Sequence, residues 1–208
     1  MLITKDLSFA FPGAAPLQFP DIHCELGEQW LLLGQSGSGK TTMLHLLAGL
    51  RRPKSGRVQV LDTVISNMST SQLDRFRGQN IGLIFQQSHF VKALTVGENL
   101  ALARRLAGLP NDQRRINELL DQLNIGNKRD QRPQSLSVGE QQRAAIARAL
   151  INEPTVILAD EPTSALDDDN TERVIELLKT QAAAVHATLL VVTHDNRLKS
   201  TFDQQISL

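Results

Sequence analysis

Several residue types that mark particular protein classes are scarce or missing in this chain of 208 residues. Its one cysteine, Cys24, allows neither an internal disulfide nor a cysteine-rich zinc site, and it fits a reducing compartment. The 22 Lys and Arg residues balance the 22 Asp and Glu residues, so the chain lacks the basic excess that is usual in nucleic-acid-binding proteins. We therefore expect no nucleic-acid partner.

The chain also lacks long apolar runs and a secretory leader pattern. Leu189–Val192 is typical of its most apolar stretches, whereas a membrane-spanning helix needs about 20 such residues. The first residues do not show a charged region followed by an apolar one. These absences predict a soluble, cytoplasmic protein, so another chain would have to supply any part that crosses a membrane.

Apolar segments with strand character alternate with amphipathic helical segments along most of the chain. Continuous apolar strands separated by helices predict an α/β fold with a mostly parallel sheet covered on both faces. The first strands alternate more and predict a separate antiparallel β layer. The expected strands are Leu2–Phe9, Leu17–Glu25, Gln29–Leu33, Arg57–Leu61, Asn80–Phe85, Thr155–Ala159 and Ala187–Val192, and the expected helices are Thr41–Gly49, Ser71–Gly78, Thr95–Gly108, Asn111–Asn124, Ser137–Ile151 and Asp167–Ala184.

The segment 34–41 reads GQSGSGKT and matches G-x-x-x-x-G-K-[ST], the pattern of a phosphate-binding loop. Glycines let the backbone wrap around an anion, and the following helix adds its positive N-terminal end. The lysine of such a loop reaches the β- and γ-phosphates, and the hydroxyl after it binds Mg²⁺. The residues expected to contact the nucleotide are Gly34, Ser36, Gly37, Ser38, Gly39, Lys40, Thr41 and Thr42, with Thr41 also on the metal.

A second apolar strand, Val156–Ala159, carries Asp160 and Glu161 at its C-terminal end, where ligands of open α/β sheets bind. Alone, this segment would be a strand followed by an ordinary turn. Beside a phosphate-binding loop it predicts a catalytic pair. We expect Asp160 to hold Mg²⁺, directly or through water, and Glu161 to orient or deprotonate the attacking water.

A third feature, LSVGEQQR over Leu136–Arg143, begins a predicted helix. Ser137 and Glu140 have the spacing of a capping box, which by itself indicates only a well-capped helix. A capped helix start with an adjacent serine and glycine is also an anion site. With these three features, the chain resembles the ATP-binding cassette of ABC transporters over nearly its whole length.

The resemblance assigns further residues in chain order. It implies that Gln86 senses Mg²⁺ and the attacking water, and that His194 contacts the γ-phosphate. It also implies that Ser164–Asp167 is the D-loop, with Asp167 at the nucleotide. As isolated residues, Gln86 and His194 would be ordinary surface and turn residues, so their order and spacing carry the assignment.

Two parts of the chain depart from the family pattern. Phe11 stands where the family usually has an adenine-stacking Tyr; the chain has no Tyr, and Phe9 and Phe19 are rival stacking residues. A ring without the hydroxyl still stacks. The signature commonly reads LSGGQ, and here its middle glycine and its glutamine are replaced. Ser137 and Gly139, the positions nearest the phosphate in the family, are kept.

The resemblance implies a P-loop NTPase built as one domain over residues 1–208. Its nucleotide core would comprise about residues 1–86 and 151–208, and its inserted helical lobe about residues 87–150. Two cassettes would form a head-to-tail homodimer, with each ATP between Lys40 of one chain and Ser137 of the other. ATP and Mg²⁺ are the implied cofactors. ATP hydrolysis would drive an integral membrane permease from the cytoplasmic face of the inner membrane.

The interval between two motifs and the single cysteine exclude some branches of the superfamily. The interval from Lys40 to Leu136 is too short for the coiled coil of the chromosome-maintenance relatives, and one cysteine excludes the zinc modules of the excision-repair relatives. The segment Ile81–Leu109 looks like the lipoprotein-releasing, macrolide-efflux type, whose members extract or expel amphiphiles and some of which use a periplasmic adaptor. The alternative is a non-transport ATPase that regulates cell-wall hydrolysis through a membrane partner.

Overall fold

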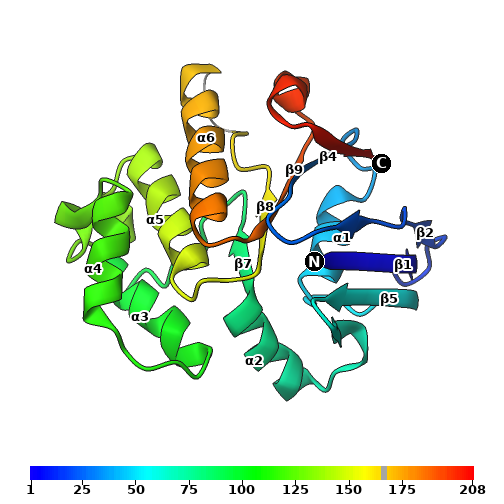
Figure 1. Ribbon diagram of the computed structural model, residues 1–208, viewed down its shortest axis with the longest axis horizontal. Helices are drawn as coiled ribbons and strands as arrows, with labels where there is room; N and C mark the ends of the chain where they lie inside the picture. The colour runs from blue at the N-terminus through cyan, green and yellow to red at the C-terminus, as the bar shows by residue number, and fades with distance from the viewer. Residues whose placement is uncertain (165–167) are drawn as a thin grey trace.

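The computed structural model describes residues 1–164 and 168–208, which form two sheets with helices between and around them (Figure 1). The central sheet has the strand order β10-β4-β9-β8-β7, and all its neighbouring strands are parallel. Its strands are β4 (Gln29–Leu33), β7 (Ile81–Ile84), β8 (Val156–Asp160), β9 (Thr188–Thr193) and β10 (Gln204–Ser207). The predicted parallel core sheet is therefore confirmed.

The central strands are apolar along their whole length because both faces of the sheet are covered. Every residue of β8 and β9 is buried. Leu158 and Leu190 join one apolar cluster with helix α1 (Lys40–Leu47) and the N-terminal strands, whereas Ile157 and Val191 join another with the remaining helices. Successive side chains of a strand point to opposite faces, so each strand contributes to both cores.

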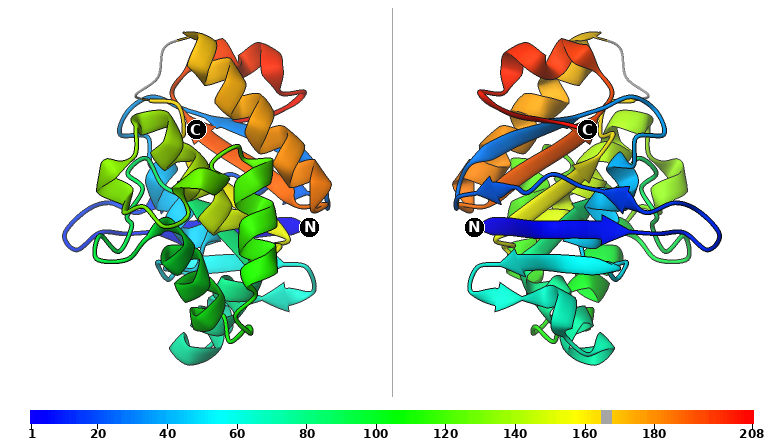
Figure 2. Two further views of the ribbon diagram at one scale, coloured as in Figure 1. Left: turned by 90° about the vertical axis from the view of Figure 1, so that its left-hand side faces the viewer. Right: turned by 90° about the vertical axis from the view of Figure 1, so that its right-hand side faces the viewer.

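The N-terminal strands form a second, antiparallel sheet that lies beside the central one (Figure 2). Its strands are β1 (Leu2–Phe9), β2 (Leu17–Gln18), β3 (His23–Cys24), β5 (Ser55–Val60) and β6 (Thr63–Val64). In this sheet β1 pairs with β2, β3 and β5, and β5 pairs with β6. The predicted antiparallel layer is confirmed.

The single strand expected over residues 17–25 is wrong, because the structure divides it into β2 and β3. Both pieces keep one register against β1, with Ser8 opposite Gln18 and Leu2 opposite Cys24. Pro20 lies between them and has no N–H to donate to a ladder. The side chain of Asp21 accepts a hydrogen bond from the backbone N–H of Asp6 at this break, at 2.7 Å.

The other α-helices are α2 (Thr70–Asn80), α3 (Val96–Leu106), α4 (Gln113–Gln122), α5 (Val138–Leu150) and α6 (Asp168–Ala184). Helices α3, α4 and α5 lie together on one side of the molecule (Figure 1). Both expected capping boxes form, Thr95 with Glu98 and Ser137 with Glu140. Helix α5 also packs on β7, so the three helices share a core with the central sheet. The division into a nucleotide core and an inserted lobe stays a prediction.

Two strands have no counterpart among the expected elements. β10 reads QQIS and is mostly exposed at the sheet edge, where an apolar strand pattern is not required. β6 has only two residues and completes a tight turn with β5. Among the helices described here, none is long and apolar enough to cross a membrane.

Candidate nucleotide-binding site

The phosphate-binding loop connects β4 to α1 at the C-terminal edge of the central sheet (Figure 1). Gly37 and Gly39 have φ values of 84° and 99°, a backbone region that favours glycine. A Cβ added to Gly34 would lie 2.6 Å from Oγ of Ser38, so the loop is too tight for a side chain there. The buried Ser38 hydroxyl has no hydrogen-bond partner among the described residues, and an anion held in this loop would supply one.

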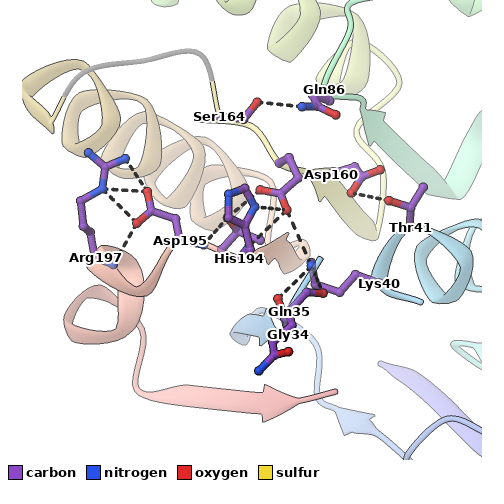
Figure 3. A network of polar contacts seen from close by, with 12 residues as sticks. Gly34, Gln35, Lys40, Thr41, Gln86, Asp160, Ser164, His194, Asp195 and Arg197 are labelled. Atoms are coloured by element: carbon purple, nitrogen blue, oxygen red, sulfur yellow. Dashed lines mark hydrogen bonds and ion pairs between the residues drawn. The ribbon is translucent and has the colours of Figure 1, made fainter. Parts of the chain in front are cut away.

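Lys40, the first residue of α1, is only 7% exposed and points back into the loop (Figure 3). Its Nζ donates hydrogen bonds to the backbone oxygens of Gly34 and Gln35, both at 2.9 Å. It also lies 3.9 Å from Oε1 of Glu161. A phosphate group would offer this ammonium stronger, charge-assisted hydrogen bonds than the two carbonyl groups do.

Asp160 ends β8 beside the start of α1, and it is 6% exposed. Oγ1 of Thr41 lies 3.4 Å from its Oδ1 (Figure 3). Burial raises the pKa of the Asp160 carboxyl, and the negative charge of Glu161 raises it further. The negative charge of the buried Asp160 is therefore not fully balanced by positive charge nearby. The Thr41 hydroxyl and the Asp160 carboxylate are oxygen ligands of the kind that Mg²⁺ prefers, so these residues fit the expected ion.

Glu161 joins the ends of β8 and β9. Its φ is 47°, and its backbone N–H donates to the oxygen of Val192 at 2.8 Å. Its carboxylate accepts hydrogen bonds from Oγ1 of Thr193 at 2.8 Å and from the backbone N–H of His194 at 3.1 Å. The ring Nδ1 of His194 lies 2.7 Å from Oε1 of the same carboxylate (Figure 3). The structure thus brings the predicted base and the predicted phosphate-contacting histidine into direct contact.

Gln86 follows β7 and meets the same edge of the sheet. Its Nε2 donates to Oγ of Ser164 at 3.2 Å (Figure 3). Gln142 of α5 donates to the backbone oxygen of Pro162 at 3.1 Å, so α5 is tied to the same turn. Ser164 leads to the predicted D-loop residue Asp167, which lies outside the described residues.

A cavity of about 380 Å³ lies over the phosphate-binding loop and Glu161 and extends to Phe11. Phe11 is 39% exposed at its wall, whereas Phe19 is buried and Phe9 packs its ring edge to face with Phe11, with centroids 5.0 Å apart. Of these three rings, Phe11 is the one that lines the cavity. The guanidinium of Arg51 lies over both rings, 5.4 Å from the Phe9 centroid and 5.3 Å from that of Phe11. The cavity is lined by Phe11, Leu17, Ser36, Gly37, Gly39, Lys40, Thr41, Thr42, Gln86, Glu161 and His194.

Ser137 and Gly139 are not among those lining residues; they stand at the N-terminal start of α5. Oγ of Ser137 accepts a hydrogen bond from the backbone N–H of Glu140 at 3.3 Å. Val138 is 64% exposed, and a Cβ added to Gly139 would meet nothing within 4 Å. The start of α5 is therefore exposed, and it lies outside the cavity that the sequence associates with it.

A glycine-rich loop between a strand and a helix, with a carboxylate pair at the edge of a parallel sheet, defines a P-loop nucleoside triphosphatase. Within that class, residues 17–164 match the family described as ABC transporter, and the chain belongs to this family. The family assignment confirms the predicted class of ATPase.

Several relatives are similar over most of the chain. The lipoprotein-releasing system ATP-binding protein LolD of Saccharophagus degradans is 37% identical over 88% of this chain and 82% of its own. The methionine import ATP-binding protein MetN of Rhodopseudomonas palustris is 39% identical over 84% of this chain but only 47% of its own. Relatives with different transported substrates thus match at similar identity.

Solved structures agree with the fold. The dimeric bacterial ABC transporter cassette MJ0796 is 32% identical, matches all of this chain and 94% of its own, and has a TM-score of 0.89. A dimeric post-hydrolysis state of the same cassette, bound to ADP and Pi, gives a TM-score of 0.87. The chain is thus a cassette of the ATP-hydrolysing kind.

Proposed function

We propose that this chain works as a head-to-tail homodimer that hydrolyses ATP between its subunits and drives a separate membrane permease. The single observation that carries the proposal is the separation of the two predicted halves of the site. The phosphate-binding loop and Glu161 line one cavity, while Ser137 and Gly139 lie outside that lining, at the exposed start of α5. A second copy of the chain would bring its open helix start over the cavity of the first.

Within that site, Lys40 binds the β- and γ-phosphates, and Phe11 stacks on adenine. Thr41, Asp160 and Gln86 hold Mg²⁺, which when bound neutralises charge on the phosphate oxygens. Glu161 orients or deprotonates the water that attacks the γ-phosphate. The second ring nitrogen of His194, Nε2, contacts the γ-phosphate while Nδ1 remains with Glu161. The D-loop residue Asp167 completes the nucleotide contacts.

A groove of about 490 Å³ between α2, β7, α3 and α5 is our candidate surface for the permease. Its walls are mostly apolar, and Leu106 at its rim is 72% exposed. Asn152 lines the groove, and its buried Oδ1 has no hydrogen-bond partner among residues whose positions are described. Phe85 lines the groove directly before Gln86, and this link would connect docking to the nucleotide site. A short amphipathic helix of the permease fits such a groove.

The transported substrate is an amphiphile that is extracted or exported, and the chain acts at the cytoplasmic face of the inner membrane. The similarity to lipoprotein-releasing ATP-binding proteins supports this part of the proposal. A periplasmic adaptor would belong to the same assembly. In native membrane vesicles, Leu106→Arg should reduce stimulation of ATPase activity by the permease, whereas Leu26→Arg, at another exposed leucine, should not.

The dimer is tested with two inactive variants. Ser137→Arg should still bind ATP at its own Lys40 but place a bulky side chain over the phosphates bound to its partner. Lys40→Ala should weaken ATP binding at its own phosphate-binding loop. A mixed dimer concentrates both lesions in one site and leaves the other site intact, so the mixture should recover phosphate release that neither variant shows alone. Full activity of Ser137→Arg by itself would contradict the head-to-tail dimer as the catalytic unit.

A further inference from the structure

One departure from the usual signature sequence has a partner in the structure. Glu140 replaces the usual glutamine, and its carboxylate is held from two sides. Oε2 accepts a hydrogen bond from the backbone N–H of Ser137 at 2.8 Å, and Oε1 lies 3.1 Å from Nζ of Lys128. Lys128 comes from a short 3₁₀ turn, Gly126–Lys128, which precedes α5 in the chain.

The two side chains are only partly exposed, Lys128 at 23% and Glu140 at 28%. The hydrogen bond from Ser137, followed by the bond to Lys128, lowers the pKa of the Glu140 carboxyl. The carboxylate therefore carries its full negative charge at neutral pH. It sits in the first turn of α5, beside the open surface formed by Ser137, Val138 and Gly139.

This charge is unfavourable if the surface receives a triphosphate, because like charges repel most strongly where water is excluded. We infer that Lys128 is a positioning residue of the trans nucleotide site: by pairing with Glu140 it cancels the charge that the altered signature would otherwise present to the partner's ATP. The inference rests on the head-to-tail dimer of the proposed function. It also gives a physical reason why a carboxylate is compatible with the signature position.

The charge argument makes an ordered set of predictions for dimer formation. In a Glu161→Gln background, where ATP should hold the dimer closed, Lys128→Met leaves the Glu140 charge uncompensated. Glu140→Gln leaves Lys128 with an excess positive charge but keeps an acceptor for Ser137. The double variant restores neutrality. We expect Lys128→Met to weaken the ATP-dependent dimer about three- to tenfold, and Glu140→Gln to tighten it about threefold.

The same reasoning predicts that the double variant stays within about twofold of the parent, and that all differences shrink as salt screens the charges. The measurement is the monomer–dimer dissociation constant with ATP, obtained by analytical ultracentrifugation at low and high ionic strength. Arg114→Met is the matched control. It removes one positive charge from an ion pair with Glu118 on α4, in which Arg114 is 88% exposed, and it should leave the constant unchanged.

Two other results would overturn the inference, and a third would contradict the proposed function instead. If the double variant is as weak as Lys128→Met, Lys128 acts on the phosphate directly rather than through Glu140. If the variants of Lys128 and Glu140 leave the dimer dissociation constant unchanged but lower the melting temperature, the ion pair only stabilises the start of α5. If the Glu161→Gln parent forms no dimer with ATP at all, the proposed function fails rather than this inference.

Discussion

Lys40, Asp160 and Glu161 are each at most 11% exposed and are held by neighbours in the same chain, whereas Val138 at the signature is 64% exposed and Gly139 faces open space. The three side chains of the first region already have hydrogen-bond partners within the chain. In the second region, Ser137 makes the hydrogen bonds of the helix cap with Glu140. A site that needs both regions can therefore be switched by bringing two chains together.

The largest effect should come from removing the base in the buried region. Glu161→Gln is isosteric, so the contacts of Thr193 and His194 persist in part, but the amide cannot deprotonate water. We expect phosphate release to fall roughly 10²–10⁴-fold while ATP binding is kept and a dimer accumulates. Glu176→Gln, at a side chain 65% exposed on α6, should behave as the parent. Turnover of Glu161→Gln within twofold of the parent would show that the catalytic assignment is wrong.

Lys40→Ala removes the cation of the same region. Hydrogen bonds to charged groups contribute about 1.5–3 kcal/mol each, so we expect ATP affinity to fall about 10–100-fold in calorimetric titrations. Lys54→Ala, at an exposed lysine in the turn before β5, is the control and should leave affinity unchanged. An unchanged affinity for Lys40→Ala would remove this residue from the site.

Asp160→Asn should separate ligand binding from stability. Burial raises the pKa of Asp160, so the ionised carboxylate opposes folding at neutral pH when no cation is bound. The variant should therefore melt a few degrees above the parent without nucleotide, but lose the stabilisation that Mg²⁺ and ATP give. Its advantage should be complete near pH 7 and fade as the pH falls through the raised pKa toward about 4, where the parent is protonated too. A lower melting temperature at pH 7 would contradict this account.

The smallest effects should lie at the base platform. Stacking on an aromatic ring contributes about 1–3 kcal/mol, so Phe11→Ala should weaken ATP binding at least about fivefold. The contact of Arg51 with this ring is worth less, and Arg51→Gln should weaken binding about two- to threefold. If Arg51 acts by holding the ring, Arg51→Gln should have no further effect in the Phe11→Ala background. An equal effect in both backgrounds would mean that Arg51 contacts the nucleotide itself.

The local patterns were sufficient where chemistry depends on neighbours in sequence. The glycine spacing around Lys40 requires a particular backbone path, and the structure has Gly37 and Gly39 in that conformation. The spacing of Ser137 and Glu140 likewise predicted a capping box that forms. Apolar strands such as β8 indicated a covered parallel sheet because burial on both faces leaves no polar alternation.

Other features depend on residues that are far apart in the chain. The family pattern favoured Phe11 as the stacking ring but left Phe9 and Phe19 as rivals. Burial of Phe19 and exposure of Phe11 decide which ring lines the cavity. The break between β2 and β3 could have been predicted locally, from Pro20. The edge strand β10, in contrast, depends on its pairing with β4, which is distant in the sequence.

The sequence by itself determined the family, the phosphate-binding loop and the order of the motifs, because each is written in adjacent residues. Only the tertiary structure decided that Glu161 rests on Thr193 and His194, and that Lys128 pairs with Glu140. Such contacts form between segments that packing brings together. Their geometry depends on how the strands and helices are arranged, and no short run of residues encodes it.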